Sequence, residues 1–131
     1  MPSLDTNCLL RWLLNDVPAQ TARLDALLAS EQEFAVPDVA LLETVFVLER
    51  VAKLDRADVA DAIETVLALG TLVIDRELWG ELLPLYLAHP KLSAADIYLG
   101  IEARRRGRTP LYTFDRKLAL QLAVGAPVPG G

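Results

Sequence analysis

The chain has 131 residues, a length that predicts one domain spanning residues 1–131. Apolar residues make up 53% of the chain, which is enough to bury a core and excludes a disordered protein. The 13 basic and 18 acidic side chains give a net charge of −5, which argues against nucleic-acid binding by bulk charge, and the single cysteine excludes an internal disulfide framework and a multi-cysteine metal site.

Short apolar runs alternate along the chain with longer segments of helical spacing. Residues 3–4 predict a first short strand, and further strands are predicted at 34–36, 71–74 and 111–114. Helices are predicted at 8–14, 21–29, 39–53, 57–69, 78–88, 93–106 and 117–123. The Gly- and Pro-rich tail, residues 124–131, leaves a short edge strand and a frayed end both open.

The order of these elements predicts the fold class. Strands separated by helices pair in parallel through right-handed crossovers. We therefore expect an α/β fold, a three-layer α/β/α sandwich around a small central parallel sheet. No internal repeat and no linker long enough to divide the chain is found in the sequence.

Three aspartates directly follow predicted strands and precede predicted helices: Asp5, Asp75 and Asp115. Ligand sites in parallel sheets lie at the carboxyl ends of strands, yet Asp is also a preferred helix N-cap. Capping is the favoured explanation for each aspartate taken alone, and for Asp75, expected at the sheet edge, it is the one we adopt. Asp5 opens an unusual polar run, residues 5–7, and Thr113 adds a hydroxyl before Asp115.

Glu43 lies on a predicted helix and is expected to interrupt a buried apolar stripe. Its neighbours one turn away are all apolar: Val39, Ala40, Phe46 and Val47. A buried carboxylate needs a cation, a hydrogen-bond donor or a proton. A functional role and a structural ion pair are both open for this residue.

Asp96 has a similar setting on the next acidic helix. Its neighbours one turn away include Leu92, Leu99 and Gly100. Ser93 and Asp96 also fit the S-x-x-[DE] capping box, so a cap and a functional carboxylate are equally open here.

Together, the four acids point to a metal site. Asp5, Glu43, Asp96 and Asp115 converge if the strands at 3–4 and 111–114 are neighbours at the centre of the sheet. An all-oxygen cluster suits Mg²⁺ or Mn²⁺, which can bind a phosphodiester and activate a water molecule. Without these four charges the net charge is −5 + 4 = −1, so a polyanionic substrate is compatible with the composition.

Basic residues are concentrated between residues 104 and 117, where six bases accompany one acid. They are explained either by a solvated helix end, where cations are favoured, or by an edge that faces phosphates. Under the second explanation Arg108 and Arg116 are candidate substrate-binding residues.

Four motifs occur in a fixed order: Asp5-Thr6-Asn7, Leu42-Glu43-Thr44, Ala95-Asp96-Ile97 and Thr113-Phe114-Asp115-Arg116. Over essentially the whole chain this resembles a PIN domain, specifically the VapC-like ribonuclease toxins of type II toxin–antitoxin pairs. The resemblance implies that Asp5, Glu43, Asp96 and Asp115 are metal ligands and catalytic residues. It also implies that Asn7 and Thr113 support them. Relatives often carry a further acid or amide shortly after the position of Asp115, where this chain has Arg116 and Lys117.

The resemblance implies a Mg²⁺- or Mn²⁺-dependent endoribonuclease that cleaves a structured RNA, forms a homodimer and is inhibited by an antitoxin. No apolar run approaches the ~18 residues of a membrane span, and Asp5 and Arg11 interrupt any signal-peptide core, so we expect a cytoplasmic protein. Three other classes remain open. They are an aspartyl phosphatase, disfavoured by Asn7, a receiver-like signalling domain, and a non-catalytic binding module. RNA cleavage that requires Mg²⁺ or Mn²⁺ separates the first function from these three.

Overall fold

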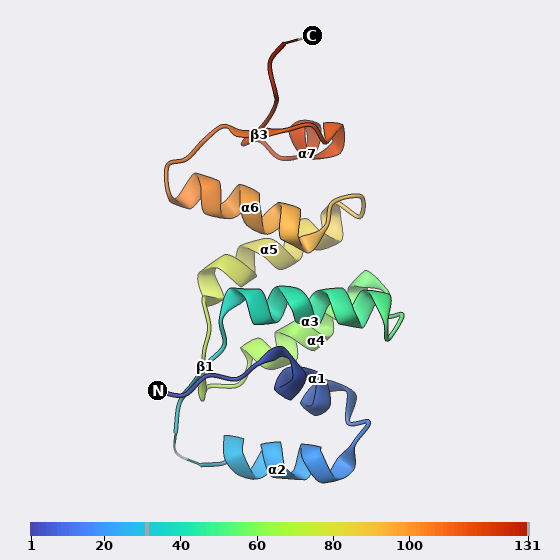
Figure 1. The fold of residues 1–131 in the computed structure, drawn as a ribbon, viewed down its shortest axis with the longest axis vertical. Coiled ribbons are helices and arrows are strands. Elements are labelled where there is room, and N and C mark those ends of the chain that lie inside the picture. The colour runs from blue at the N-terminus through green and yellow to red at the C-terminus, as the bar shows by residue number, and fades with distance from the viewer. Residues whose placement is uncertain (31, 131) are drawn as a thin grey trace. The chain divides into compact units, whose positions relative to one another are not determined.

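The computed structural model describes residues 1–30 and 32–130, which fold into two compact units (Figure 1). Unit 1, Met1–Arg76, holds α1 (Thr6–Leu14), α2 (Pro18–Leu28), β1 (Phe34–Ala35), α3 (Asp38–Arg50), α4 (Arg56–Leu67) and β2 (Leu72–Val73). Unit 2, from Glu77 onward, holds α5 (Arg76–Ala88, whose first residue belongs to unit 1), α6 (Ala94–Arg105), β3 (Leu111–Thr113), α7 (Arg116–Gln121) and β4 (Gly125–Pro127).

The predicted helices and strands are present with small shifts at their ends. All strand pairs in the described residues are parallel, which confirms the α/β class with a short parallel sheet. The tail contributes the edge strand β4, while its last residue, Gly131, lies outside the described residues. The strand predicted at residues 3–4 is reduced to a single bridge between Ser3 and Ala35.

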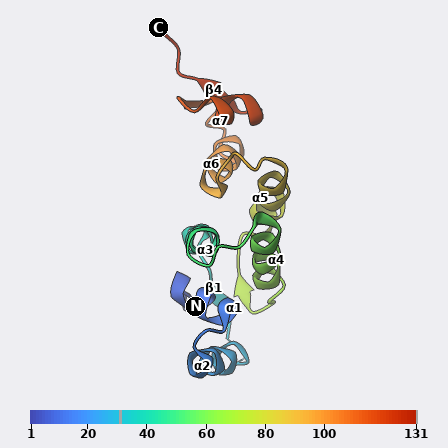
Figure 2. The ribbon, with the colours of Figure 1, turned by 90° about the vertical axis from the view of Figure 1, so that its right-hand side faces the viewer.

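Unit 1 is built around the β1–β2 pair and the helices that contact it. Phe34 pairs with Leu72, and both side chains are almost fully buried. Helices α3 and α4 lie side by side, as Figure 2 shows. The buried residues of α3 recur at helical spacing and are Ala40, Leu41, Thr44, Val45 and Leu48. This stripe fixes which face of α3 is turned inward.

Unit 2 places a short parallel pair, β3 and β4, against α7. The chain approaches itself so closely here that a Cβ at Gly125 would lie 2.7 Å from the Leu118 carbonyl oxygen. Only glycine fits this position without a backbone shift. The buried face of α5 is large and apolar, with Leu78, Trp79, Leu82, Leu83 and Tyr86.

Side-chain caps define where four of the helices begin. Asp5 caps α1, Asp55 caps α4, Ser93 caps α6 and Asp115 caps α7. Each cap accepts a hydrogen bond from one of the first amides of its helix, groups that have no partner within the helix. Two of the four acids singled out in the sequence are thereby fixed at helix N-termini.

Candidate active site

Asp5 lies at the junction between the Ser3 bridge and α1. Its Oδ1 atom accepts a hydrogen bond of 3.0 Å from the Cys8 amide, and this bond lowers the pKa of the Asp5 carboxyl group. The side chain is exposed, and Oδ2 makes no hydrogen bond with any described residue. Asp5 therefore caps the helix with one oxygen and presents the other to solvent or to a ligand.

Glu43 is tied to the same part of unit 1 by a contact across 37 positions of sequence. The Thr6 hydroxyl, next to Asp5 in the chain, donates a 2.8 Å hydrogen bond to Glu43 Oε2. The sequence analysis did not single out Thr6 as a site residue. Its only sequence signal is its place within the Asp5-Thr6-Asn7 motif.

The prediction that Glu43 is buried is wrong. The side chain is exposed, and Val39 and Phe46, one turn away on α3, are themselves 60% and 59% exposed. The inward stripe of α3 passes through Thr44 instead, which is fully buried and donates its hydroxyl hydrogen bond to the Ala40 carbonyl at 2.7 Å. Apolar residues on more than one face of α3 made the buried face ambiguous in the sequence.

Asp96 is the third residue of α6, and the capping box is present in part. The Asp96 amide donates a 3.1 Å hydrogen bond to the Ser93 hydroxyl. The Asp96 carboxylate is half-buried and makes no hydrogen bond within the described part of the chain. Its oxygens are available to an external partner.

Asp115 repeats in unit 2 the arrangement of Asp5 in unit 1. Its Oδ1 atom accepts hydrogen bonds from the Lys117 amide at 2.9 Å and the Leu118 amide at 3.3 Å. The Thr113 hydroxyl accepts a 2.9 Å hydrogen bond from the Asp115 amide. Thr113 therefore fixes the backbone that carries Asp115, and Oδ2 is left without a hydrogen bond to any described residue.

The basic segment that ends α6 is largely neutralised within its own unit. Arg104 forms a two-pronged ion pair with Glu81, whose carboxyl pKa it lowers. Glu102 accepts from Arg106 Nε at 2.9 Å and lies 3.5 Å from Arg105 Nη1. These contacts favour the solvated helix end for residues 104–106.

Arg108 and Arg116 differ from that segment, since both are exposed and neither forms an ion pair with a described residue. Phe114, between Thr113 and Asp115, is 89% exposed. The sequence analysis did not single out Phe114, and its apolar character alone gave no signal of exposure.

Each unit therefore carries two of the four predicted acids. Asp5 and Glu43 are linked through Thr6 in unit 1, whereas no hydrogen bond joins the Asp96 and Asp115 side chains in unit 2. Among residues 1–30 and 32–130, no group of three or more His, Cys, Asp or Glu side chains is placed to hold a metal ion. Carboxylates that keep oxygens without hydrogen bonds are nonetheless donors that Mg²⁺ and Mn²⁺ prefer.

An α/β protein with carboxylates at the ends of its parallel strands belongs to a class in which ligands bind at those ends. The family model of the PIN domain matches residues 3–121, and the chain therefore belongs to the PIN domain family. PIN domains are typically metal-dependent nucleases that act on RNA, so membership assigns the chain to a nuclease family. Comparison with curated proteins found no match, and neither did comparison with solved structures. In the part of the chain that the structure describes, no helix has the length and apolar character needed to cross a membrane.

Proposed function

We propose that this protein is a VapC-like toxin, a metal-dependent endoribonuclease that hydrolyses phosphodiester bonds in a structured RNA. The proposal rests on membership of the PIN domain family and on one observation about the acids. Asp5, Glu43, Asp96 and Asp115 each keep a carboxylate oxygen that makes no hydrogen bond with a described residue. We take residues 1–131 as a single nuclease domain.

The ligands of the proposed metal ion are these four carboxylates. Hard oxygen donors fit Mg²⁺ or Mn²⁺ and do not fit softer metals, which prefer sulfur and imidazole. Such an ion, when bound, neutralises phosphate charge and lowers the pKa of a water molecule. A nucleophilic side chain is not needed, because water is the nucleophile in hydrolysis.

Neighbouring residues hold these carboxylates in place. Thr6 orients Glu43 through its 2.8 Å hydrogen bond, and Thr113 fixes the backbone of Asp115 through a bond of 2.9 Å. Asn7 shares the cleft beside Asp5 and is proposed as a supporting amide. Arg108 and Arg116, exposed and without ion pairs to described residues, are proposed to contact substrate phosphates.

The partners follow from the proposed toxin role. An inhibitor of an acidic site is expected to place Arg or Lys among the carboxylates, where the cation substitutes for the charge of the metal ion. We therefore propose a cognate antitoxin with a basic contact segment, a homodimeric toxin and action in the cytoplasm.

The decisive experiment is RNA cleavage by the purified protein freed of any antitoxin. Cleavage should require Mg²⁺ or Mn²⁺, stop with EDTA, and be lost in Asp5→Asn and Asp96→Asn. Asp61→Asn, which removes an exposed acid from α4, is the matched control and should cleave at the wild-type rate. Metal-independent cleavage, or full activity in the Asp5 and Asp96 variants, would refute the proposal.

A further inference from the structure

A cleft of about 590 Å³ lies between α1 and α2 in unit 1, and Asp5 is among the residues that line it. The α2 side of the cleft is formed by Gln20, Arg23, Leu24 and Leu27. These four residues recur at i, i+3, i+4 and i+7, so one continuous face of α2 is turned toward the cleft. Arg11 lines the cleft from α1.

The charge of this cleft is opposite to that of the unit around it. Unit 1 carries 6 basic and 13 acidic side chains, a balance of 6 − 13 = −7. The cleft is lined by two arginines and one aspartate, a balance of 2 − 1 = +1. A local excess of positive charge in an acidic unit favours an anionic ligand.

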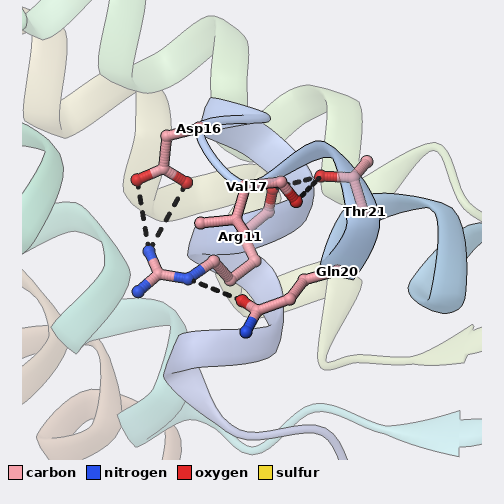
Figure 3. Close-up of polar contacts among 5 residues, drawn as sticks. All are labelled: Arg11, Asp16, Val17, Gln20 and Thr21. Carbon is pink, nitrogen blue, oxygen red and sulfur yellow. Dashed lines mark hydrogen bonds and ion pairs between the residues drawn. The ribbon is translucent and has the colours of Figure 1, made fainter.

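Arg11 is held in a fixed orientation, as Figure 3 shows. Its Nε donates to Gln20 Oε1 at 3.0 Å, and its Nη1 lies 3.2 Å from Asp16 Oδ2. The third nitrogen, Nη2, makes no hydrogen bond with a described residue. A guanidinium that is oriented in advance and keeps a free donor binds phosphate with little loss of side-chain entropy.

Arg23 provides a second cation on the same cleft. It is exposed and forms no ion pair with a residue that the structure describes. Leu24 and Leu27 add apolar surface beside it, suited to the faces of sugars and bases. Cations interleaved with apolar surface are typical of grooves that follow a nucleic-acid backbone.

We propose that Arg11 and Arg23 bind backbone phosphates of a single-stranded segment of the RNA substrate, in the cleft that also contains Asp5. The inference rests on the proposed nuclease function, because it makes the cleft the path by which the strand reaches Asp5. An acidic protein segment would also suit two arginines. The RNA strand is favoured because a proposed metal ligand lines the same cleft.

The test is equilibrium binding of a labelled single-stranded RNA oligonucleotide in EDTA, which prevents cleavage, at several salt concentrations. Arg11→Gln and Arg23→Gln should each weaken binding about fivefold at 0.1 M salt and reduce the slope of log K against log salt by about 0.7. Arg50→Gln is the matched control, since Arg50 lies over the Phe46 ring on α3 and is not among the residues lining the cleft. Arg23 makes no ion pair that folding could require, so its variant keeps the test valid if Arg11→Gln is unstable.

Asp16→Asn distinguishes a phosphate site from a structural role of Arg11. An asparagine oxygen can still accept from Arg11 Nη1, but the competing anion is gone, so RNA affinity should rise while Arg11→Gln lowers it. If Arg11 served only to join α1 to α2, neither variant would change RNA affinity relative to Arg50→Gln.

In cleavage assays the two arginine variants should raise KM and leave kcat near wild type. Wild-type RNA affinity in both arginine variants would overturn the cleft proposal while leaving the nuclease function intact, and would favour a protein occupant. RNA that binds through the arginines but is never cleaved would instead refute the nuclease function alone.

Discussion

Asp5 is proposed to cap a helix and to bind a metal ion, and two substitutions at this position separate the roles. Asp5→Asn keeps an oxygen that can accept from the Cys8 amide, now 3.0 Å from Asp5 Oδ1. Asp5→Ala removes the cap, which costs about 1 kcal/mol. For a chain of this length that corresponds to a melting temperature lower by about 3–5 °C. RNA cleavage should be lost in both variants, because neither retains a carboxylate.

The pH dependence of these stabilities has a defined sign. The hydrogen bond from Cys8 lowers the pKa of Asp5 in the folded protein below its ordinary value of 3.8. The stabilisation due to the carboxylate is therefore fully present above pH 3.8 and is lost as the pH falls through the folded-state pKa. Because Asp5 is exposed, this charge contribution is small. Asp5→Asn should thus melt slightly below wild type at neutral pH and level with it in acid, whereas Asp5→Ala stays lower throughout.

Asp55 provides an internal control for the same geometry. It caps α4 by accepting from the Asp58 amide at 2.9 Å, as Asp5 caps α1. Asp55→Ala should lower the melting temperature by a similar amount and leave RNA cleavage unchanged. Thermal melts from pH 3 to 7 together with cleavage rates measure both effects. Cleavage retained by Asp5→Ala, or equal loss of cleavage in Asp55→Ala, would refute the division of roles.

Three further outcomes are expected. Glu43→Gln should lose RNA cleavage but change the free energy of unfolding by no more than about 0.5 kcal/mol in thermal melts, because Glu43 is exposed; a large destabilisation would make it a structural residue. Mn²⁺ at about 100 times its Kd should stabilise wild type by about 2.7 kcal/mol, measured as a rise in melting temperature, and should stabilise Asp96→Asn much less. An equal rise in both would exclude Asp96 as a ligand. Gly125→Ala should lower the free energy of unfolding by about 1–3 kcal/mol in denaturant titrations, since its Cβ would lie 2.7 Å from a backbone oxygen of Leu118; wild-type stability would contradict this close approach.

The helices and strands were predictable because they depend on local spacing and local caps. The stripe at 41, 44, 45 and 48 identifies α3 as a helix whatever its surroundings. Which face of α3 is buried was not predictable in the same way. Val39 and Phe46 are apolar yet mostly exposed, so apolar neighbours did not establish the burial of Glu43. Burial depends on what packs against the helix, and the sequence of one helix does not contain that information.

Contacts between distant residues limited the prediction of the site in the same manner. The ion pair between Arg106 and Glu102 spans one helical turn and follows from spacing alone. The pair between Arg104 and Glu81 spans 23 positions, and the bond from Thr6 to Glu43 spans 37. Neither of these long-range contacts follows from local spacing. The basic segment consequently had two explanations in the sequence, and the pairing with Glu81 and Glu102 favours one of them for residues 104–106.

The choice between a cap and a ligand, open for Asp5 and Asp115 in the sequence, does not have to be made. A carboxylate has two oxygens, and in both residues the backbone amides bond only Oδ1. The cap restricts the side chain to one orientation and keeps it ionised near the positive end of the helix dipole. A metal ligand needs the same two properties, a fixed direction and a negative charge, on its other oxygen. Capping is therefore how the fold prepares these carboxylates for the proposed metal ion, and the same hydrogen bond that stabilises the helix also aims the free oxygen.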